Sequence, residues 1–174
     1  MIYLVFGEMG IGKNFVGERL ADKLKCYFVD GDQFLTAEMQ AKVKAFKPLT
    51  KQDLDVFMRE LVKGVAGMYK GSDLVVAQAL YRQEHRDWIK NELSKQNIST
   101  TFVWIPVSSL LTHIKRLWSR SFKWVLYGMF NKLFFQKPTG SFLTIHNRDE
   151  RHLDNQLCVI RSFKNWNGIG QPPK

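Results

Sequence analysis

Short apolar runs alternate along this chain with longer segments of helical spacing. The apolar runs predict buried strands at Ile2–Phe6, Tyr27–Val29, Leu74–Gln78, Thr101–Ile105 and Phe142–Ile145. The segments between and after them predict helices at Lys13–Leu24, Leu35–Ala45, Lys51–Tyr69, Glu84–Lys95, Ser109–Arg120, Lys123–Phe135 and Glu150–Phe163. This alternation is typical of a three-layer α/β/α fold with a five-stranded parallel sheet. We expect a single domain over residues 1–164 and a loosely ordered tail over residues 165–174.

The helix predicted at Lys51–Tyr69 has the clearest periodicity. Thr50 is its expected N-cap, with Asp53 in the first turn. One apolar stripe at helical spacing comprises Leu54, Phe57, Met58, Leu61 and Val65. We expect this stripe to be core and not a binding face.

A glycine-rich loop separates the first predicted strand from the first predicted helix. It reads Gly7-Glu8-Met9-Gly10-Ile11-Gly12-Lys13-Asn14. Strand, loop and helix follow one another as a phosphate-binding loop requires, so that backbone N–H groups and the helix dipole face an anion. Lys13 then reaches the outer phosphates. A glycine-rich turn that fits the motif by chance is the alternative, and the context favours nucleotide binding.

Candidate metal and acceptor groups lie close to this loop. The final position of the motif normally carries a Ser or Thr hydroxyl that ligates magnesium, and here it is Asn14. Asp30 and Asp32 follow the second strand, at the sheet edge where open α/β sheets bind ligands. Phosphoryl transfer needs a metal site and a carboxylate that orients the acceptor, and these two aspartates can divide those roles. The alternative is a polar turn in which Asp32 caps the next helix.

Positive charge is concentrated in the last third of the chain. Residues 1–112 hold 15 Lys+Arg and 13 Asp+Glu, whereas residues 113–174 hold 11 and 3, within a net charge of +10. This distribution suits a lid over nucleotide phosphates; a solvated face, or a surface for RNA or anionic lipid, is the alternative. The same part of the chain carries aromatic residues at helical spacing, which favours a packed lid helix over an aromatic platform for nucleic acid. These residues are Trp118, Trp124, Tyr127, Phe130, Phe134 and Phe135.

Composition narrows the class of protein further. Cys26 and Cys158 are too few for a disulfide framework, and the four histidines, His85 among them, show no ligand spacing. No apolar run is long enough to cross a bilayer, and the N-terminus lacks the pattern of a signal peptide. We therefore expect a cytoplasmic protein without a membrane partner, either a monomer or a homodimer.

The opening segment, from Gly7 to Asp32, resembles the start of shikimate kinases in its G-x-M-G-x-G-K loop, Gly17, Leu20-Ala21 and D-x-D. Farther on, the chain resembles gluconate kinases. The residues that carry this second likeness are Asp30-Gly31-Asp32, Pro48-Leu49-Thr50 with Asp53, and Val75-Val76-Ala77-Gln78-Ala79-Leu80 with Arg82, Arg86 and Asp87. Both are families of P-loop small-metabolite kinases with a nucleoside-monophosphate-kinase-like fold, which implies a helical lid, here at about residues 116–137.

The resemblance implies a role for each matching position. Gly7 to Lys13 would bind the phosphates of ATP, Asp30 with Asn14 would hold Mg²⁺, and Asp32 would engage the acceptor hydroxyl as base. Arg82 and Arg86 would grip an anionic acceptor, since guanidinium groups suit carboxylates. Arg116 and Arg120 would act as lid arginines, Arg116 on the nucleotide and Arg120 on the transferred phosphate, unless they form an exposed basic helix end.

The chain departs from both families on the acceptor side. Gln78-Ala79-Leu80 stands where shikimate kinases carry Gly-Gly-Gly, and gluconate kinases have Ser at the position of Gln78. Ser121-Phe122-Lys123 replaces the Gly-His-Phe segment of gluconate kinases, and one extra residue separates Leu80 from Arg86.

The interpretation that the motifs and the resemblance favour is an ATP-dependent kinase of a small anionic metabolite. A nucleotide-binding pseudokinase, impaired at Asn14, and a nucleic-acid-binding protein or end kinase are the alternatives.

Overall fold

The computed structural model describes residues 1–107, 118, 122–147 and 149–167. Its centre is a parallel sheet of five strands in the order β2-β3-β1-β4-β5. The strands are β1 (Ile2–Gly7), β2 (Tyr27–Asp30), β3 (Leu74–Ala77), β4 (Thr100–Ile105) and β5 (Leu143–Thr144). All five predicted strands are confirmed, and the strand β5 is shorter than predicted because only Leu143 and Thr144 pair with β4.

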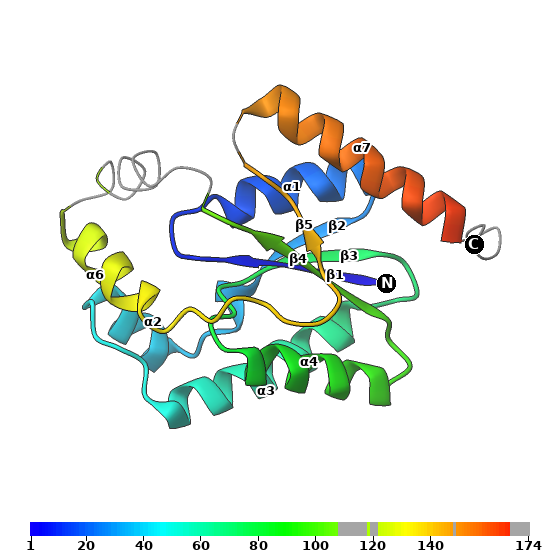
Figure 1. The fold of residues 1–174 in the computed structure, drawn as a ribbon. Coiled ribbons are helices and arrows are strands. Elements are labelled where there is room, and N and C mark those ends of the chain that lie inside the picture. The colour runs from blue at the N-terminus through cyan, green and yellow to red at the C-terminus, as the bar shows by residue number, and fades with distance from the viewer. Residues whose placement is uncertain (108–117, 119–121, 148, 168–174) are drawn as a thin grey trace.

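Helices cover both faces of this sheet (Figure 1). The helices α1 (Lys13–Leu24) and α7 (Glu150–Asn167) lie on one face. The helices α3 (Lys51–Met68) and α4 (Gln83–Lys95) lie on the other. Two further helices, α2 (Ala37–Lys44) and α6 (Phe122–Lys132), lie beyond the carboxyl ends of the strands, at the left of Figure 1. The predicted helix Ser109–Arg120 lies outside the described residues.

Alternation along β1 explains why the core has two halves. Ile2, Leu4 and Phe6 pack with the apolar side chains of α3 and α4, whereas Tyr3 and Val5 pack with those of α1 and α7. All six residues of β1 are buried, as expected for a central strand of a parallel sheet. The alternation thus fixes which helices cover each face.

The second helix begins later than its apolar pattern predicts. Residues Gly31–Phe34 form a short 3-10 helix, η1, and Thr36 caps α2 by accepting a hydrogen bond from the N–H of Met39 at 3.3 Å. Because a Thr N-cap has an extended backbone, the helix starts at Ala37 and not at Leu35. This turn places the loop after β2 at the edge of the sheet.

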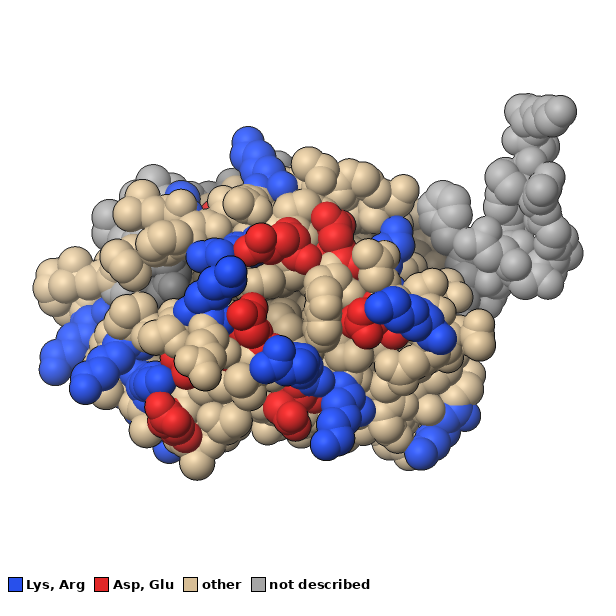
Figure 2. Space-filling model, turned by 90° about the horizontal axis from the view of Figure 1, so that it is seen from below, with Lys and Arg blue, Asp and Glu red and all other residues tan. Residues whose placement is uncertain are grey.

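Charge on the face formed by α3 and α4 is mixed. Figure 2 shows this face with basic and acidic side chains interspersed across it, and not as one continuous basic surface. None of the helices within the described ranges is both long and apolar enough to span a bilayer.

Candidate functional site

The glycine-rich loop connects the end of β1 to the first residue of α1. Gly10 and Gly12 have φ angles of 75° and 95°, in the left-handed region that glycine adopts without a steric penalty, and Gly12 is the N-cap of α1. The Nζ of Lys13 donates a hydrogen bond to the carbonyl oxygen of Glu8 at 3.0 Å. The lysine therefore bends back over its own loop, at the helix N-terminus where an anion is favoured.

Asn147, from the segment after β5, supports this loop. Its side chain is 9% exposed, and its Nδ2 donates to the carbonyl oxygen of Ile11 at 3.0 Å. The side chain of Ile11 is buried in the core, so the loop is held through both its backbone and its side chain. Sequence reasoning missed Asn147, because nothing in the local pattern links it to a loop 136 residues earlier.

Asn14 and Asp30 contact each other directly. The Nδ2 of Asn14 donates to Oδ2 of Asp30 at 2.6 Å, and Oδ1 of Asp30 accepts from the N–H of Asp32 at 3.0 Å. A carboxylate only accepts hydrogen bonds, so the amide nitrogen of Asn14 faces Asp30 and the amide oxygen remains as an acceptor. Asp30 caps η1 and Thr36 caps α2, so the alternative that Asp32 caps the next helix is wrong.

Asp32 is held in place by a residue from the neighbouring strand. Gln78, which follows β3 and is 5% exposed, donates from Nε2 to Oδ1 of Asp32 at 3.1 Å. Burial raises the pKa of Asp32 above its ordinary value, the charge of Asp30 raises it further, and the Gln78 hydrogen bond and Lys13 lower it. The sequence showed Gln78 only as a departure from the families that the chain resembles; its contact with Asp32 requires that β2 and β3 be neighbours.

These groups line one cavity of about 680 Å³ at the carboxyl ends of the strands. Its polar lining comprises Lys13, Asn14, Asp30, Asp32, Gln78, Arg82 and His85. Its larger apolar lining comprises Phe15, Leu35, Val43, Pro48, Leu49, Leu54, Phe57, Met58, Phe130 and Phe134, together with Met9 and two alanines. Tyr81 lines the cavity as well and carries both an aromatic ring and a hydroxyl group. The structure thus brings together the loop residues Met9, Gly10, Gly12, Lys13 and Asn14 with Asp30, Asp32 and Arg82, as the sequence predicted.

The apolar stripe of α3 has two roles. Leu61 and Val65 are buried in the core, as predicted. Phe57 and Met58 also belong to the core, as predicted, although they line the cavity as well. Leu54 is half-buried and lines the cavity without belonging to the core cluster, so the prediction was wrong for this residue. Helical periodicity finds the buried face but does not tell a packed neighbour from a cavity wall.

Arg86 does not lie in the cavity. It is 1% exposed, its Nε donates to Gln83 at 3.1 Å, and its guanidinium also donates to the carbonyl oxygens of Leu80 and Gln136. The guanidinium carbon lies 5.0 Å from the centre of the Phe6 ring. The assignment of Arg86 to the acceptor is therefore corrected to a structural role that ties α4 to the sheet and to residue 136.

Arg82 lines the cavity, which was the place predicted for both Arg82 and Arg86. It is the N-cap residue of α4, its side chain lines the cavity, and its Nη1 lies 3.0 Å from Oε1 of Glu84. His85 also lines the cavity, and burial lowers its pKa below the ordinary value. His85 was assigned no role from the sequence because the histidines show no ligand spacing; its position three residues after Arg82 was the available signal.

The remaining predicted residues lie around or beyond this cavity. Gly7 packs against the backbone of Ile105, where a Cβ would lie 2.6 Å from the carbonyl oxygen. Arg116 and Arg120 lie outside the described residues, as does part of the predicted lid. Of the predicted lid aromatics, Phe130 and Phe134 line the cavity and Phe135 packs on Tyr81.

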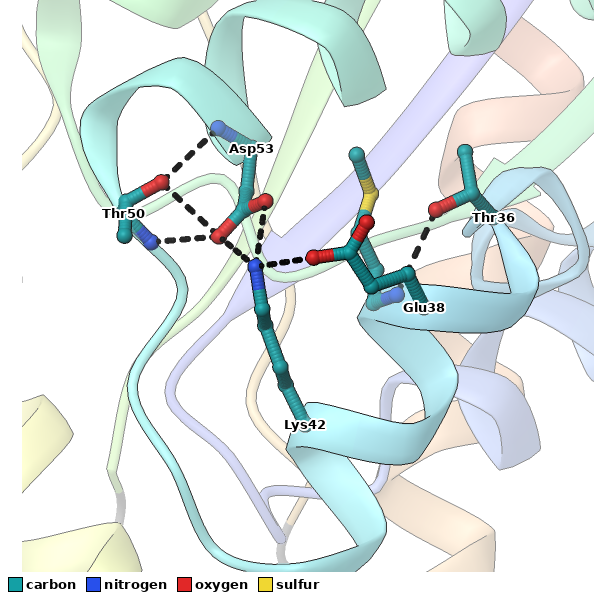
Figure 3. Close-up of polar contacts among 6 residues, drawn as sticks. Thr36, Glu38, Lys42, Thr50 and Asp53 are labelled. Carbon is teal, nitrogen blue, oxygen red and sulfur yellow. Dashed lines mark hydrogen bonds and ion pairs between the residues drawn. The ribbon is translucent and has the colours of Figure 1, made fainter.

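A polar network joins α2 to the start of α3 and so fixes the apolar wall of the cavity (Figure 3). Lys42 lies between two carboxylates, with Nζ 2.8 Å from Glu38 and 2.9 Å from Asp53. Thr50 and Asp53 form a capping box, in which each side chain accepts from the other residue's backbone N–H at 3.2 and 2.8 Å. The predicted Thr50 cap is confirmed, and its partner Asp53 also holds the helix before it.

This network predicts an acid-sensitive contribution to stability. The hydrogen bonds from Lys42 and Thr50 lower the pKa of Asp53 from 3.8 to about 2. A carboxyl group whose pKa is lowered by folding contributes stability above its unfolded pKa, and this is lost as pH falls through the folded pKa. Between about pH 4 and about pH 2, the urea midpoint of the wild type should therefore fall more steeply than that of Asp53→Asn. Equal slopes would contradict this account, and Asp55→Asn, exposed on the same helix, is the control.

A glycine-rich loop with its lysine beside two carboxylates, at the carboxyl edge of a parallel sheet, defines a P-loop phosphotransferase of the nucleoside-monophosphate-kinase-like fold. A family model described as shikimate kinase matches residues 9–123, more than half of the chain. The chain therefore belongs to the shikimate kinase family of P-loop small-metabolite kinases.

Two curated relatives and one solved structure fit this assignment. The chain is 26% identical over 103 residues to a probable gluconokinase of Dictyostelium discoideum, covering 56% of this chain and 52% of that protein. It is 31% identical over 77 residues to a shikimate kinase of Macrococcus caseolyticus (strain JCSC5402), covering 44% of each. The chain thus spans about half the length of the curated relatives it matches. A gluconokinase crystal structure from Sinorhizobium meliloti 1021 shares the fold, with a TM-score of 0.76, 18% identity and 95% of each chain covered.

Proposed function

We propose that this chain is an ATP-dependent kinase that phosphorylates a hydroxyl group of a small anionic metabolite. The observation that carries the proposal is the position of Lys13 and Asp32 in one cavity, at the ends of β1 and β2. The loop from Gly7 to Lys13 would bind the phosphates of ATP, with Lys13 at the outer ones. Family membership and the names of the two curated relatives support a kinase, and both names imply a hydroxylated acid as acceptor.

The reaction follows from the placement of these side chains. The acceptor oxygen attacks the γ-phosphorus, the bond between that phosphorus and the β,γ-bridging oxygen breaks, and ADP leaves. Asp32 accepts the hydroxyl proton, because it is a buried carboxylate that Gln78 holds at the cavity wall. Arg82 binds the anionic group of the acceptor. Arg116 and Arg120 stay predictions as phosphate ligands from the lid.

The residues beside the loop suit a magnesium ion. Asp30 offers carboxylate oxygens and Asn14 an amide oxygen, which are the hard donors that Mg²⁺ prefers. Asp30 and Asn14 would hold the ion, which would supply positive charge to offset that of the phosphates. The hydrogen bond between Asn14 and Asp30 orients both side chains but also engages one Asp30 oxygen.

That hydrogen bond predicts an unusual magnesium requirement. Asn14→Ser removes the amide from Asp30 and supplies a hydroxyl at the position where the motif normally has one. We expect the variant to need less magnesium for half-maximal ATP turnover than the wild type. An unaltered requirement in an active enzyme would mean that position 14 does not act on the metal, and Asn155→Ser, exposed on α7, is the control.

A second candidate function is a nucleotide-binding pseudokinase. The engagement of Asp30 by Asn14 favours it, since it competes with magnesium for that carboxylate. Formation of ADP, followed in the presence of magnesium and a panel of hydroxy acids, tests the first candidate against the second. Acceptor-dependent ADP formation supports the kinase; nucleotide binding without ADP formation in either the wild type or Asn14→Ser supports the pseudokinase.

A further inference from the structure

The cavity has a chemically uneven wall. Its polar groups come from the glycine-rich loop, from the ends of β2 and β3, and from the start of α4. Among the described residues, every lining side chain that residues 35–58 and 130–134 contribute is apolar. Leu49, Leu54, Phe57 and Met58 are examples from the α2–α3 connection and α3, and Phe130 and Phe134 are those from α6 and the residues after it.

This apolar wall is built into the fold. The network of Lys42, Thr50 and Asp53 fixes the start of α3, so Leu54 lies one residue after the capping box that orients it. Phe57 and Met58 are each 4% exposed and belong to the larger core cluster. Phe57 and Met58 therefore extend the core to the cavity, whereas Phe130 and Phe134 are 46% and 47% exposed.

An apolar wall selects against a polyol. Each hydroxyl group that a ligand buries without a hydrogen-bond partner lowers its affinity about tenfold to a hundredfold. A gluconate-like chain carries several such hydroxyl groups, and the described side chains that could pair with them beside the apolar wall are few, namely Tyr81, Arg82 and His85. An apolar ring or branched alkyl group gains affinity from the same wall because its surface leaves water.

We propose that the acceptor carries its reactive hydroxyl on an apolar body, a ring or a branched alkyl group without further hydroxyl groups, and has one anionic group for Arg82. The apolar body lies against Leu54, Phe57 and Phe134, with the hydroxyl directed to Asp32. The inference rests on the proposed kinase function in one respect: that function makes the bound molecule a phosphate acceptor. The preference for an apolar ligand follows from the lining of the cavity alone.

Binding, measured by calorimetry on the full chain, tests the selectivity without turnover. The probes are three monoanionic hydroxy acids with apolar bodies (3-phenyllactate, mandelate and 2-hydroxyisocaproate), compared with gluconate, which has the same charge. We expect at least one of the three to bind about tenfold more tightly than gluconate, a difference that burial of a small apolar group produces. If gluconate binds as tightly as the best of the three, or more tightly, the inference is overturned.

A matched pair of variants places the binding in this cavity. Leu54→Gln puts an amide of similar size in the wall, and it should weaken the best apolar probe about tenfold and leave gluconate unchanged or tighter. Val159→Gln makes a polar change on α7, where the side chain is 53% exposed, and should affect neither probe. An unaltered affinity of the apolar probe in Leu54→Gln would overturn the inference; Leu49→Gln, in the α2–α3 connection, replaces it if Leu54→Gln does not fold.

Phosphate transfer, assayed separately with the same acids, distinguishes the two proposals. Transfer to gluconate together with tighter gluconate binding would overturn the apolar acceptor and leave the kinase in place. Tighter binding of an apolar acid, lost in Leu54→Gln, with no transfer from ATP to any acid would support the selectivity and count against the kinase.

Discussion

Replacing Asp32 by asparagine is expected to lower phosphate transfer by about two or more orders of magnitude, the usual scale for loss of a positioned base. The change keeps the shape of the side chain, and its amide oxygen still accepts the hydrogen bond from Gln78 that Asp32 accepts at 3.1 Å. The charge and the proton acceptor are lost, so the affinity for ATP should be retained. Initial rates with the acceptor that supports wild-type transfer, together with calorimetry of ATP binding, measure both quantities.

Asp22→Asn is the matched control for this variant, since Asp22 is exposed near the end of α1 and away from the cavity. Its transfer rate should equal that of the wild type. If Asp32→Asn transfers phosphate at the wild-type rate, Asp32 is not the base, and its buried carboxylate has only a structural part in the cavity wall.

Replacing Lys13 by alanine is expected to weaken ATP binding by about one to two orders of magnitude. Lys13 is the basic side chain that the loop itself supplies, and charge-assisted hydrogen bonds to phosphate contribute about 1.5–3 kcal/mol. Its Nζ donates a hydrogen bond to the Glu8 carbonyl oxygen at 3.0 Å, which holds the side chain over the loop. Calorimetry with ATP and with ADP measures the loss.

Lys23→Ala, in the last turn of α1, controls for the removal of a positive charge from the same helix. It should leave ATP affinity unchanged. Equal ATP affinity in the wild type and Lys13→Ala would remove the glycine-rich loop from the nucleotide site, whereas a loss for ATP that exceeds the loss for ADP would place Lys13 at the γ-phosphate.

The fold and the glycine-rich end of the cavity followed from the sequence because their signals are local. The run from Gly7 to Asn14 specifies the turn and the start of the helix within a few residues. The strands were predicted because a parallel sheet buries both of its faces, which gives continuous apolar runs such as Ile2–Phe6. Thr50 and Asp53 specified a cap that the structure contains.

The part of the cavity that Arg82 and Leu54 line could not be predicted in the same way, because it depends on tertiary contacts that a local sequence pattern does not contain. The sequence does not distinguish Arg82 from Arg86. In the structure Arg82 lines the cavity, whereas Arg86 is buried, because it packs on the Phe6 ring and donates to the backbone of Gln136. Leu54 belongs to a helical stripe that predicts core, yet it lies outside the core cluster and lines the cavity.

Transfer of a radiolabelled γ-phosphate is the most direct test of the central claim that this chain is a kinase. The full chain is incubated with labelled ATP, magnesium and a panel that contains polyol acids and apolar hydroxy acids, and the products are separated by chromatography. We expect label in one acceptor phosphate with the wild type and its loss in Asp32→Asn. Tight ATP binding without labelled acceptor, in both the wild type and Asn14→Ser, would contradict the claim and leave a nucleotide-binding protein without transfer.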